Sequence, residues 1–117
     1  MRYLKEQNPN IKGILADPVG STLGGGEHRE YHIEGIGNDF IADTMDMSLV
    51  DEIIKISDEE AFNASRELTA KEGIFAGTSA GAILAAAKKL AVKKTAGNFV
   101  IILPDRGERY FSKDLYL

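Results

Sequence analysis

Apolar residues follow two different spacings along this chain. Short apolar runs fall at residues 11–16, 51–56 and 99–103, and the last of these is five apolar residues in succession. Runs of this length between turn residues are typical of strands, and a run without polar positions is typical of a strand covered on both faces in a parallel sheet. The pattern therefore predicts three strands over these ranges.

Helical spacing appears in two longer segments. After Ser57 the small and apolar residues repeat at the spacing of one helix face, and this inner stripe comprises Ala61, Phe62, Ser65, Leu68 and Thr69. Ser57 followed by Glu60 matches a capping box, and Gly73 is placed to end the helix. Residues 82–90 are apolar on nearly every side, which predicts a buried helix.

A further short helix is predicted over Met1–Gln7, where the turn Asn8-Pro9 ends it. Strands and helices then alternate along the chain, and glycine-rich or charged loops connect them. This alternation predicts the α/β class, with right-handed crossovers between parallel strands.

Composition narrows the function classes. The chain has 117 residues, enough for about one small domain, and its 44% hydrophobic and 27% charged residues are ordinary for a globular protein. It contains no Cys and two His, which excludes a disulfide framework and gives no metal site. A net charge of −4 argues against nucleic acid as a partner, and no apolar run has membrane-spanning length. With no signal peptide, the expected location is the cytoplasm.

Three loops hold the candidate chemistry. They are Glu34–Gly37, Gly77–Gly81 and Pro104–Glu108. The second opens a predicted helix and the third follows a predicted strand. Ligands in open α/β sheets bind outside the carboxyl ends of the strands, so we expect these loops to meet there.

Besides a ligand site shared with the other two loops, the middle loop, Gly77–Gly81, permits two further interpretations. Gly77-x-Ser79-x-Gly81 matches the nucleophile elbow of serine hydrolases, but both His residues precede Ser79, whereas that fold places its His after the Ser. Alternatively, Ser79 caps the following helix, because Ser is a preferred N-cap residue. The loop lacks the Gly-Lys ending of a P-loop.

Six short motifs follow one another along the chain. They are Arg2-Tyr3-Leu4-Lys5 with Asn8-Pro9, Asp17-Pro18 with Gly20-Ser21, Glu34-Gly35-Ile36-Gly37 with Phe40-Ile41, Ser57–Ala61, Gly77–Gly81, and Ile102-Leu103-Pro104-Asp105 with Gly107–Tyr110. In this order they resemble the carboxyl-terminal part of the cysteine synthase and cystathionine β-synthase family, which are pyridoxal-phosphate enzymes of the tryptophan-synthase-β fold.

The resemblance implies a fold and a cofactor site. Residues 1–117 would form the C-terminal portion of the large domain of a fold-type-II enzyme, a partial parallel-sheet, three-layer (αβα) domain, with the N-terminal domain that carries the catalytic lysine absent. The Ser79 hydroxyl would meet the pyridine nitrogen of pyridoxal phosphate. The other implied cofactor-binding residues are Gly35, Ile36, Gly37, Pro104 and Asp105.

The resemblance also implies a reaction. The parent enzyme would catalyse β-replacement on serine or O-acetylserine with sulfide or homocysteine, giving cysteine or cystathionine. Asn38-Asp39 leaves open which of the two types applies. No catalytic residue is assigned to this chain, and we expect it to be inactive alone, without covalently bound cofactor.

Two partner predictions complete the picture. A non-catalytic role, docking the tail of a serine acetyltransferase, is the alternative function implied by the family. Sheet edges left unpaired invite pairing with another chain, so we expect a homodimer or higher association.

Overall fold

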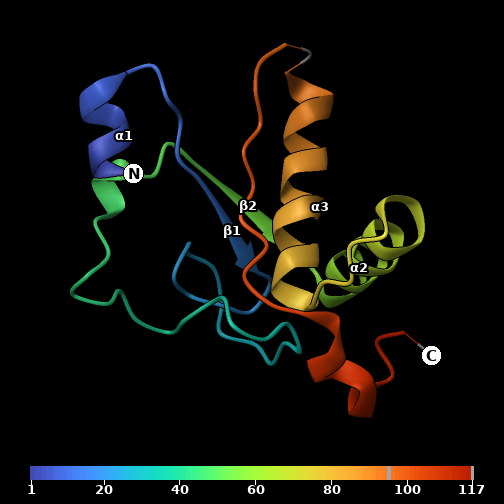
Figure 1. The fold of residues 1–117 in the computed structure, drawn as a ribbon. Helices are drawn as coiled ribbons and strands as arrows, with labels where there is room; N and C mark the ends of the chain where they lie inside the picture. Colours follow the sequence, from blue (N-terminus) through green and yellow to red (C-terminus); the bar gives the residue numbers. More distant parts are fainter. Residues whose placement is uncertain (95, 117) are drawn as a thin grey trace.

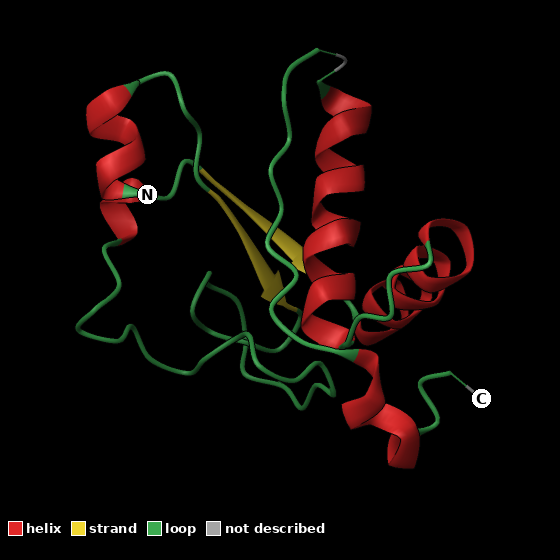
Figure 2. Cartoon of the chain, viewed as in Figure 1, coloured by secondary structure: helices red, strands yellow, loops and turns green. Residues whose placement is uncertain are grey.

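The computed structural model describes residues 1–94 and 96–116. Two parallel strands and three α-helices form its framework (Figures 1 and 2), together with two 3-10 helices. In chain order the elements are α1 (Arg2–Gln7), β1 (Ile14–Pro18), η1 (Met47–Leu49), β2 (Glu52–Ile56), α2 (Asp58–Glu72), α3 (Thr78–Lys93) and η2 (Gly107–Lys113). The predicted α/β class with a parallel sheet is confirmed.

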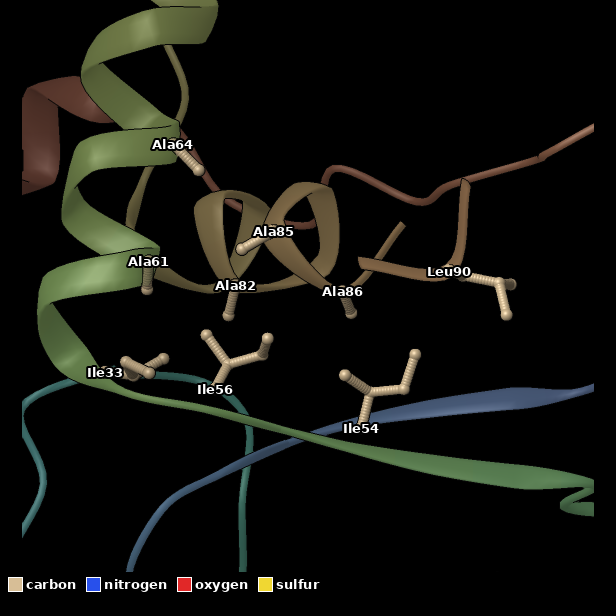
Figure 3. Close-up of a cluster of buried hydrophobic side chains, with 9 residues drawn as sticks. All are labelled: Ile33, Ile54, Ile56, Ala61, Ala64, Ala82, Ala85, Ala86 and Leu90. Atoms are coloured by element: carbon tan, nitrogen blue, oxygen red, sulfur yellow. The ribbon is translucent and has the colours of Figure 1, made fainter. Parts of the chain in front are cut away.

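The sheet is a parallel pair in which Ile14 lies opposite Glu52 and Pro18 opposite Ile56. Helix α3 lies over one face of this pair, and α2 packs against α3 near the carboxyl ends of the strands (Figures 1 and 3). The predicted helical layer on the second face stays a prediction.

The core between sheet and helices is built from isoleucines on one side and alanines on the other. Figure 3 shows Ile54 and Ile56 of β2 pointing toward α3. The buried cluster comprises Ile33, Ile54, Ile56, Ala61, Ala64, Ala82, Ala85, Ala86 and Leu90. Alanine side chains let the helices approach the sheet and each other closely, and branched isoleucines fill the remaining space.

Helix α2 has the ends that its sequence predicts. Ser57 Oγ accepts from the Glu60 N–H, and the Glu60 carboxylate accepts from the Ser57 N–H, so both halves of the capping box form. Gly73 follows in the left-handed conformation, with φ of 69°. Of the predicted inner stripe, Phe62 and Thr69 are only half-buried, while Ala64 is buried and was missed.

The first strand begins and ends later than its apolar run. It was predicted over 11–16, whereas pairing runs from Ile14 to Pro18. Asp17 and Pro18 remain in the strand because Pro18 is its last residue, where the missing N–H removes no bond from the middle of the ladder. The second strand, predicted over 51–56, is confirmed as Glu52–Ile56.

The predicted strand at 99–103 is wrong for this structure. The segment has no strand partner in the described part of the chain, and Val100 and Ile102 are 92% and 73% exposed. Leu103 alone packs inward, against the cluster of Leu68, Ala76 and Ala80. A strand requires a hydrogen-bonded neighbour, and in the described residues this segment pairs with the free edge of neither β1 nor β2, so hydrophobicity alone does not bring it into the sheet.

Helix α3 is longer than predicted, because it starts at Thr78 rather than at 82. Its N-cap is Gly77, which places Ser79 inside the first turn, so the interpretation of Ser79 as the capping residue is wrong. Among the residues described, no helix is long and apolar enough to cross a membrane.

Gly81 is the point of closest approach between α2 and α3. A Cβ at this position would lie 2.1 Å from both the Ala61 carbonyl oxygen and Ser65 Oγ. Gly81→Ala should therefore destabilise the fold by about 1–3 kcal/mol, the cost of overpacking a core, although helix propensity alone would favour Ala. Urea denaturation measures the change. Ala91→Gly, at an exposed site on the same helix, should lose about 1 kcal/mol from propensity alone. A Gly81→Ala variant as stable as the parent would contradict the tight contact.

Asp51 ties α1, which buries no residue of its own, to the segment before β1. Its Oδ2 accepts from Lys5 Nζ at 2.5 Å and from the Gly13 N–H at 2.7 Å. The bonds from Lys5 and Gly13 lower the pKa of Asp51 from 3.8 to about 2. A lowered pKa means that this stabilisation is present above pH 4 and is lost as pH falls toward 2. Amide exchange of α1 should rise over that interval, and Asp51→Asn should reduce the pH dependence while Glu6→Gln should not.

Candidate functional site

The three loops singled out in the sequence meet at the N terminus of α3. The Glu34 N–H donates to Thr78 Oγ1 at 3.0 Å, which joins the first loop to the second. The Ala80 N–H donates to Asp105 Oδ1 at 3.2 Å, which joins the second to the third. The loops therefore surround one turn, residues 77–81, and meet as predicted, although the third loop follows no strand in the described residues.

Ser79 is enclosed at the centre of this turn, with 1% of its surface exposed. The hydrogen bonds that fasten the turn use its neighbours Gly77, Thr78 and Ala80. Gly35 lies next to Ser79: a Cβ built on Gly35 would be 3.6 Å from Ser79 Oγ. Gly35 also has φ of +84°, which L side chains rarely adopt, so glycine is needed there to bring backbone alongside the hydroxyl.

Ile36 and Gly37 pack against the rest of the domain. Ile36 is half-buried against the main core cluster. A Cβ at Gly37 would lie 2.7 Å from Tyr31 Oη and 2.9 Å from Pro18 Cγ, so a glycine allows this loop to close over the end of β1. Of the predicted residues, Pro104 is exposed, beside the half-buried Asp105.

Asp105 is fixed by two donors. One oxygen accepts from the Ala80 N–H and the other from Tyr110 Oη at 2.6 Å. A carboxylate at a helix N terminus is stabilised by the helix dipole and by the unpaired N–H groups there. This end of α3 already holds an anion and is not a free phosphate site.

Tyr110 is a functional candidate to which the sequence analysis gave no role, although it named the residue as part of the motif Gly107–Tyr110. It is 4% exposed on η2. Burial, and then the hydrogen bond to Asp105, raise the pKa of its phenol above 10. The only available signal was an aromatic residue five positions after Asp105.

A cavity of about 400 Å³ adjoins the turn and shares Thr78 with it. An ion pair between Glu34 and Lys113, both lining residues, crosses this region. The residues that line the cavity are Tyr31, His32, Glu34, Phe62, Thr78, Tyr110, Lys113 and Leu115. Sequence reasoning did not find this cavity, because it assembles residues from four separate segments.

A second missed feature is a buried ion pair at the carboxyl ends of the strands. Asp17 is fully buried, and its Oδ2 lies 2.5 Å from Lys55 Nζ. Lys55 also donates to the Ser21 carbonyl at 2.7 Å, and the Gly24 N–H donates to Asp17. In the described residues Asp17 Oδ1 has no partner. The pair anchors the glycine-rich loop that follows β1.

Both histidines pair with carboxylates, and His32 also lines the cavity. His28 Nδ1 lies 3.0 Å from Asp39 Oδ1, and His32 Nδ1 lies 2.9 Å from Asp58 Oδ2. Within residues 1–94 and 96–116 no cluster of three His, Cys, Asp or Glu residues could hold a metal ion.

Comparison with known proteins identifies the class of this α/β domain. Residues 1–105 match the family model described as pyridoxal-phosphate dependent enzyme, and the chain belongs to that family. It is 48% identical over 115 residues to the O-acetylserine dependent cystathionine β-synthase of Bacillus subtilis, covering 97% of this chain and 38% of the relative. It is 44% identical over 116 residues to the cysteine synthase of Helicobacter pylori strain J99, covering 98% and 38%.

Solved structures agree. The chain superimposes on O-acetylserine dependent cystathionine β-synthase from Helicobacter pylori with a TM-score of 0.87 and 44% identity, covering 99% of this chain and 38% of the other. For cysteine synthase from Entamoeba histolytica the TM-score is 0.92 at 39% identity, covering 98% and 35%. The chain thus spans a little over a third of the length of these relatives. The family read from the six motifs is confirmed, whereas the placement of the chain in the carboxyl-terminal part stays a prediction. The hydrolase and acetyltransferase-docking alternatives gain no support.

The residues present fit the family's cofactor in their chemistry. Pyridoxal phosphate carries a ring nitrogen that accepts a hydrogen bond, and Ser79 provides a hydroxyl that the bonds fastening its turn do not use. Gly35 provides backbone without a side chain beside that hydroxyl. Asp105, in contrast, is occupied by Ala80 and Tyr110.

The Tyr110–Asp105 bond makes a testable prediction. Asp105→Asn removes the negative charge that helps to keep the phenol protonated, so the pKa of Tyr110 should fall while remaining raised by burial. Because the folded pKa is raised, the associated stability is present below pH 10 and is lost as pH rises through the pKa of the folded state. Phenolate absorbance in an alkaline titration reports both effects. An Asp105→Asn curve that overlays that of the parent chain would contradict the assignment, and Asp43→Asn, at an exposed site, is the matched control.

Proposed function

We propose that this chain is the C-terminal portion of the large domain of a pyridoxal-phosphate dependent β-replacement enzyme of cysteine biosynthesis or transsulfuration. The observation that carries the proposal is the enclosed Ser79 hydroxyl on the first turn of α3, with the backbone of Gly35 beside it. When bound, the cofactor supplies an electron sink for elimination and replacement at the β-carbon of an amino acid.

In this proposal Ser79 donates its hydroxyl proton to the pyridine nitrogen as a hydrogen bond. A carboxylate in that place would hold the nitrogen protonated, whereas a hydroxyl leaves it essentially neutral. Asp105 is kept from taking that role by its bonds to Ala80 and Tyr110. Gly35, Ile36 and Gly37 line the ring with backbone and one apolar side chain, and Pro104 lies at the same edge.

The lysine that links the cofactor covalently is proposed to lie outside these 117 residues. A lysine used for such a linkage must lose its charge, and a neighbouring carboxylate opposes that loss. Lys55 is paired with Asp17, and Lys113, which lines the cavity near the site, is paired with Glu34. Lys5, Lys12, Lys71, Lys88, Lys89 and Lys93 also have carboxylate partners.

The substrates follow from the relatives and remain part of the proposal. The printed names include cysteine synthases and O-acetylserine dependent cystathionine β-synthases. We infer an amino-acid substrate of the serine or O-acetylserine type and a sulfur nucleophile, sulfide or homocysteine. A homodimeric enzyme in the cytoplasm is the setting in which we expect this activity.

A chimera tests the proposal. The 117 residues replace the matching 38% of the Bacillus subtilis relative, and binding of pyridoxal phosphate is followed by absorbance. Ser79→Ala should weaken cofactor binding about 2- to 10-fold, the factor expected for a net hydrogen bond of ~0.5–1.5 kcal/mol. Formation of cystathionine from O-acetylserine and homocysteine should fall as well.

Two controls make the chimera decisive. Ser112→Ala, the same substitution at an exposed site, should bind cofactor as the parent chimera does. After borohydride reduction, peptide mapping should find the modified lysine in the Bacillus part. A modified lysine within the 117 residues, or Ser79→Ala binding that equals the parent, would count against the proposed site.

A further inference from the structure

The phenol oxygen of the buried Tyr110 is hydrogen-bonded to Asp105, which in turn accepts from the site turn, while the ring of Tyr110 packs directly against Gly77. Tyr110 Oη donates to Asp105 Oδ2 at 2.6 Å, and Asp105 Oδ1 accepts from the Ala80 N–H at 3.2 Å. Ala80 directly follows Ser79. A chain of two hydrogen bonds therefore connects η2, near the end of the described residues, to the first turn of α3.

The contacts around Gly77 show that this connection closes tightly on the turn. A Cβ on Gly77 would lie 2.1 Å from Asp105 Oδ2 and 2.3 Å from Tyr110 Cε2, so these two side chains occupy the space that a larger residue would need. From the opposite side, Ser65 Oγ of α2 donates to the Gly77 carbonyl at 2.8 Å. The turn is thus held between α2 and the pair formed by Asp105 and Tyr110.

Backbone contacts set the starting point of η2. The Gly107 N–H donates to the Phe75 carbonyl at 3.1 Å, and Ala76 and Arg106 form an antiparallel bridge. The segment that leads into the turn, Phe75 and Ala76, is therefore bonded to the residues at which η2 begins. From that anchor, Tyr110 reaches back to Asp105, which closes a ring of contacts around residues 77–81.

We propose that Tyr110 is a positioning residue that fixes the Ser79 turn through the carboxylate of Asp105. The inference rests on the proposed function for its purpose, the placement of the Ser79 hydroxyl, and it assigns Asp105 to holding the turn rather than to contacting the cofactor. With both carboxylate oxygens engaged, Asp105 is directed at Ala80 and Tyr110, which leaves the hydroxyl of Ser79 to face the pyridine nitrogen.

A double-mutant cycle on the 117-residue chain tests this without any cofactor. Tyr110→Phe removes only the phenolic oxygen and keeps the ring, while Asp105→Ala removes the intermediary. Amide hydrogen exchange of residues 78–80, followed by NMR, should be about 2- to 10-fold faster in each single variant, as for the loss of one net hydrogen bond. The double variant should exchange no faster than Asp105→Ala alone, because Tyr110 acts through Asp105.

Three outcomes would overturn the proposal. They are unchanged exchange in Tyr110→Phe, effects that multiply in the double variant, and acceleration that extends equally to Ser65 and Leu68 of α2, which would indicate general loosening. Tyr3→Phe, the same substitution at a residue 69% exposed on α1, is the matched control and should change nothing. If Asp105→Ala does not fold, Asp105→Asn, which keeps one acceptor oxygen, takes its place in the cycle.

The cycle fails independently of the proposed function. It measures the order of the turn in the free chain, whereas Ser79→Ala in the chimera measures cofactor binding. If Tyr110→Phe leaves amide exchange unchanged but Ser79→Ala weakens cofactor binding in the chimera, the role of Tyr110 is wrong and the proposed cofactor site stands. If exchange changes as expected but Ser79→Ala binds cofactor as the parent does, the cofactor site is wrong and the role of Tyr110 in ordering the turn stands.

Discussion

The close contact between α2 and α3 is the constraint on which the other parts of this molecule depend. Ser65 Oγ lies 2.8 Å from the Gly77 carbonyl oxygen and 3.1 Å from that of Ala61, so the single proton of one buried hydroxyl joins the middle of α2 to the residue that caps α3. Gly81 and the alanines of α3 make the approach possible, because larger side chains would separate the helices. The site turn is built directly on this contact, and its position is therefore set by the core.

The enclosed turn at residues 77–81 is also where the loop at Glu34–Gly37 and the loop at Asp105 meet. The segment at Glu34–Gly37 reaches the turn from the end of β1, and the segment at Asp105 reaches it after 99–103. Both meet the N terminus of α3, where N–H groups lack partners within the helix. The Ala80 N–H donates to Asp105, while Thr78 accepts from the Glu34 N–H through its side-chain oxygen. Neither bond uses the hydroxyl of Ser79, which lies between them.

Local signals predicted well what local forces determine. The capping box of Ser57 and Glu60 and the left-handed Gly73 involve residues a few positions apart, and both form as predicted. The order of the motifs predicted the family, which the comparisons confirm. Long-range features were not accessible in the same way. Glu34 is bonded to Thr78 far along the chain, and the buried Asp17 pairs with Lys55 on the neighbouring strand. The segment 99–103 has the sequence of a strand, although it has no strand partner among the described residues.

The exposed segment at 99–103 bears on how this chain behaves at high concentration. It combines an aromatic residue with β-branched residues, carries no charge and contains no proline, and Val100 and Ile102 face outward. Windows of this composition are those on which intermolecular sheets grow, and a net charge of −4 spread over the rest of the surface does little to protect one uncharged stretch. This stretch is therefore one surface through which copies of the chain would associate as the concentration rises.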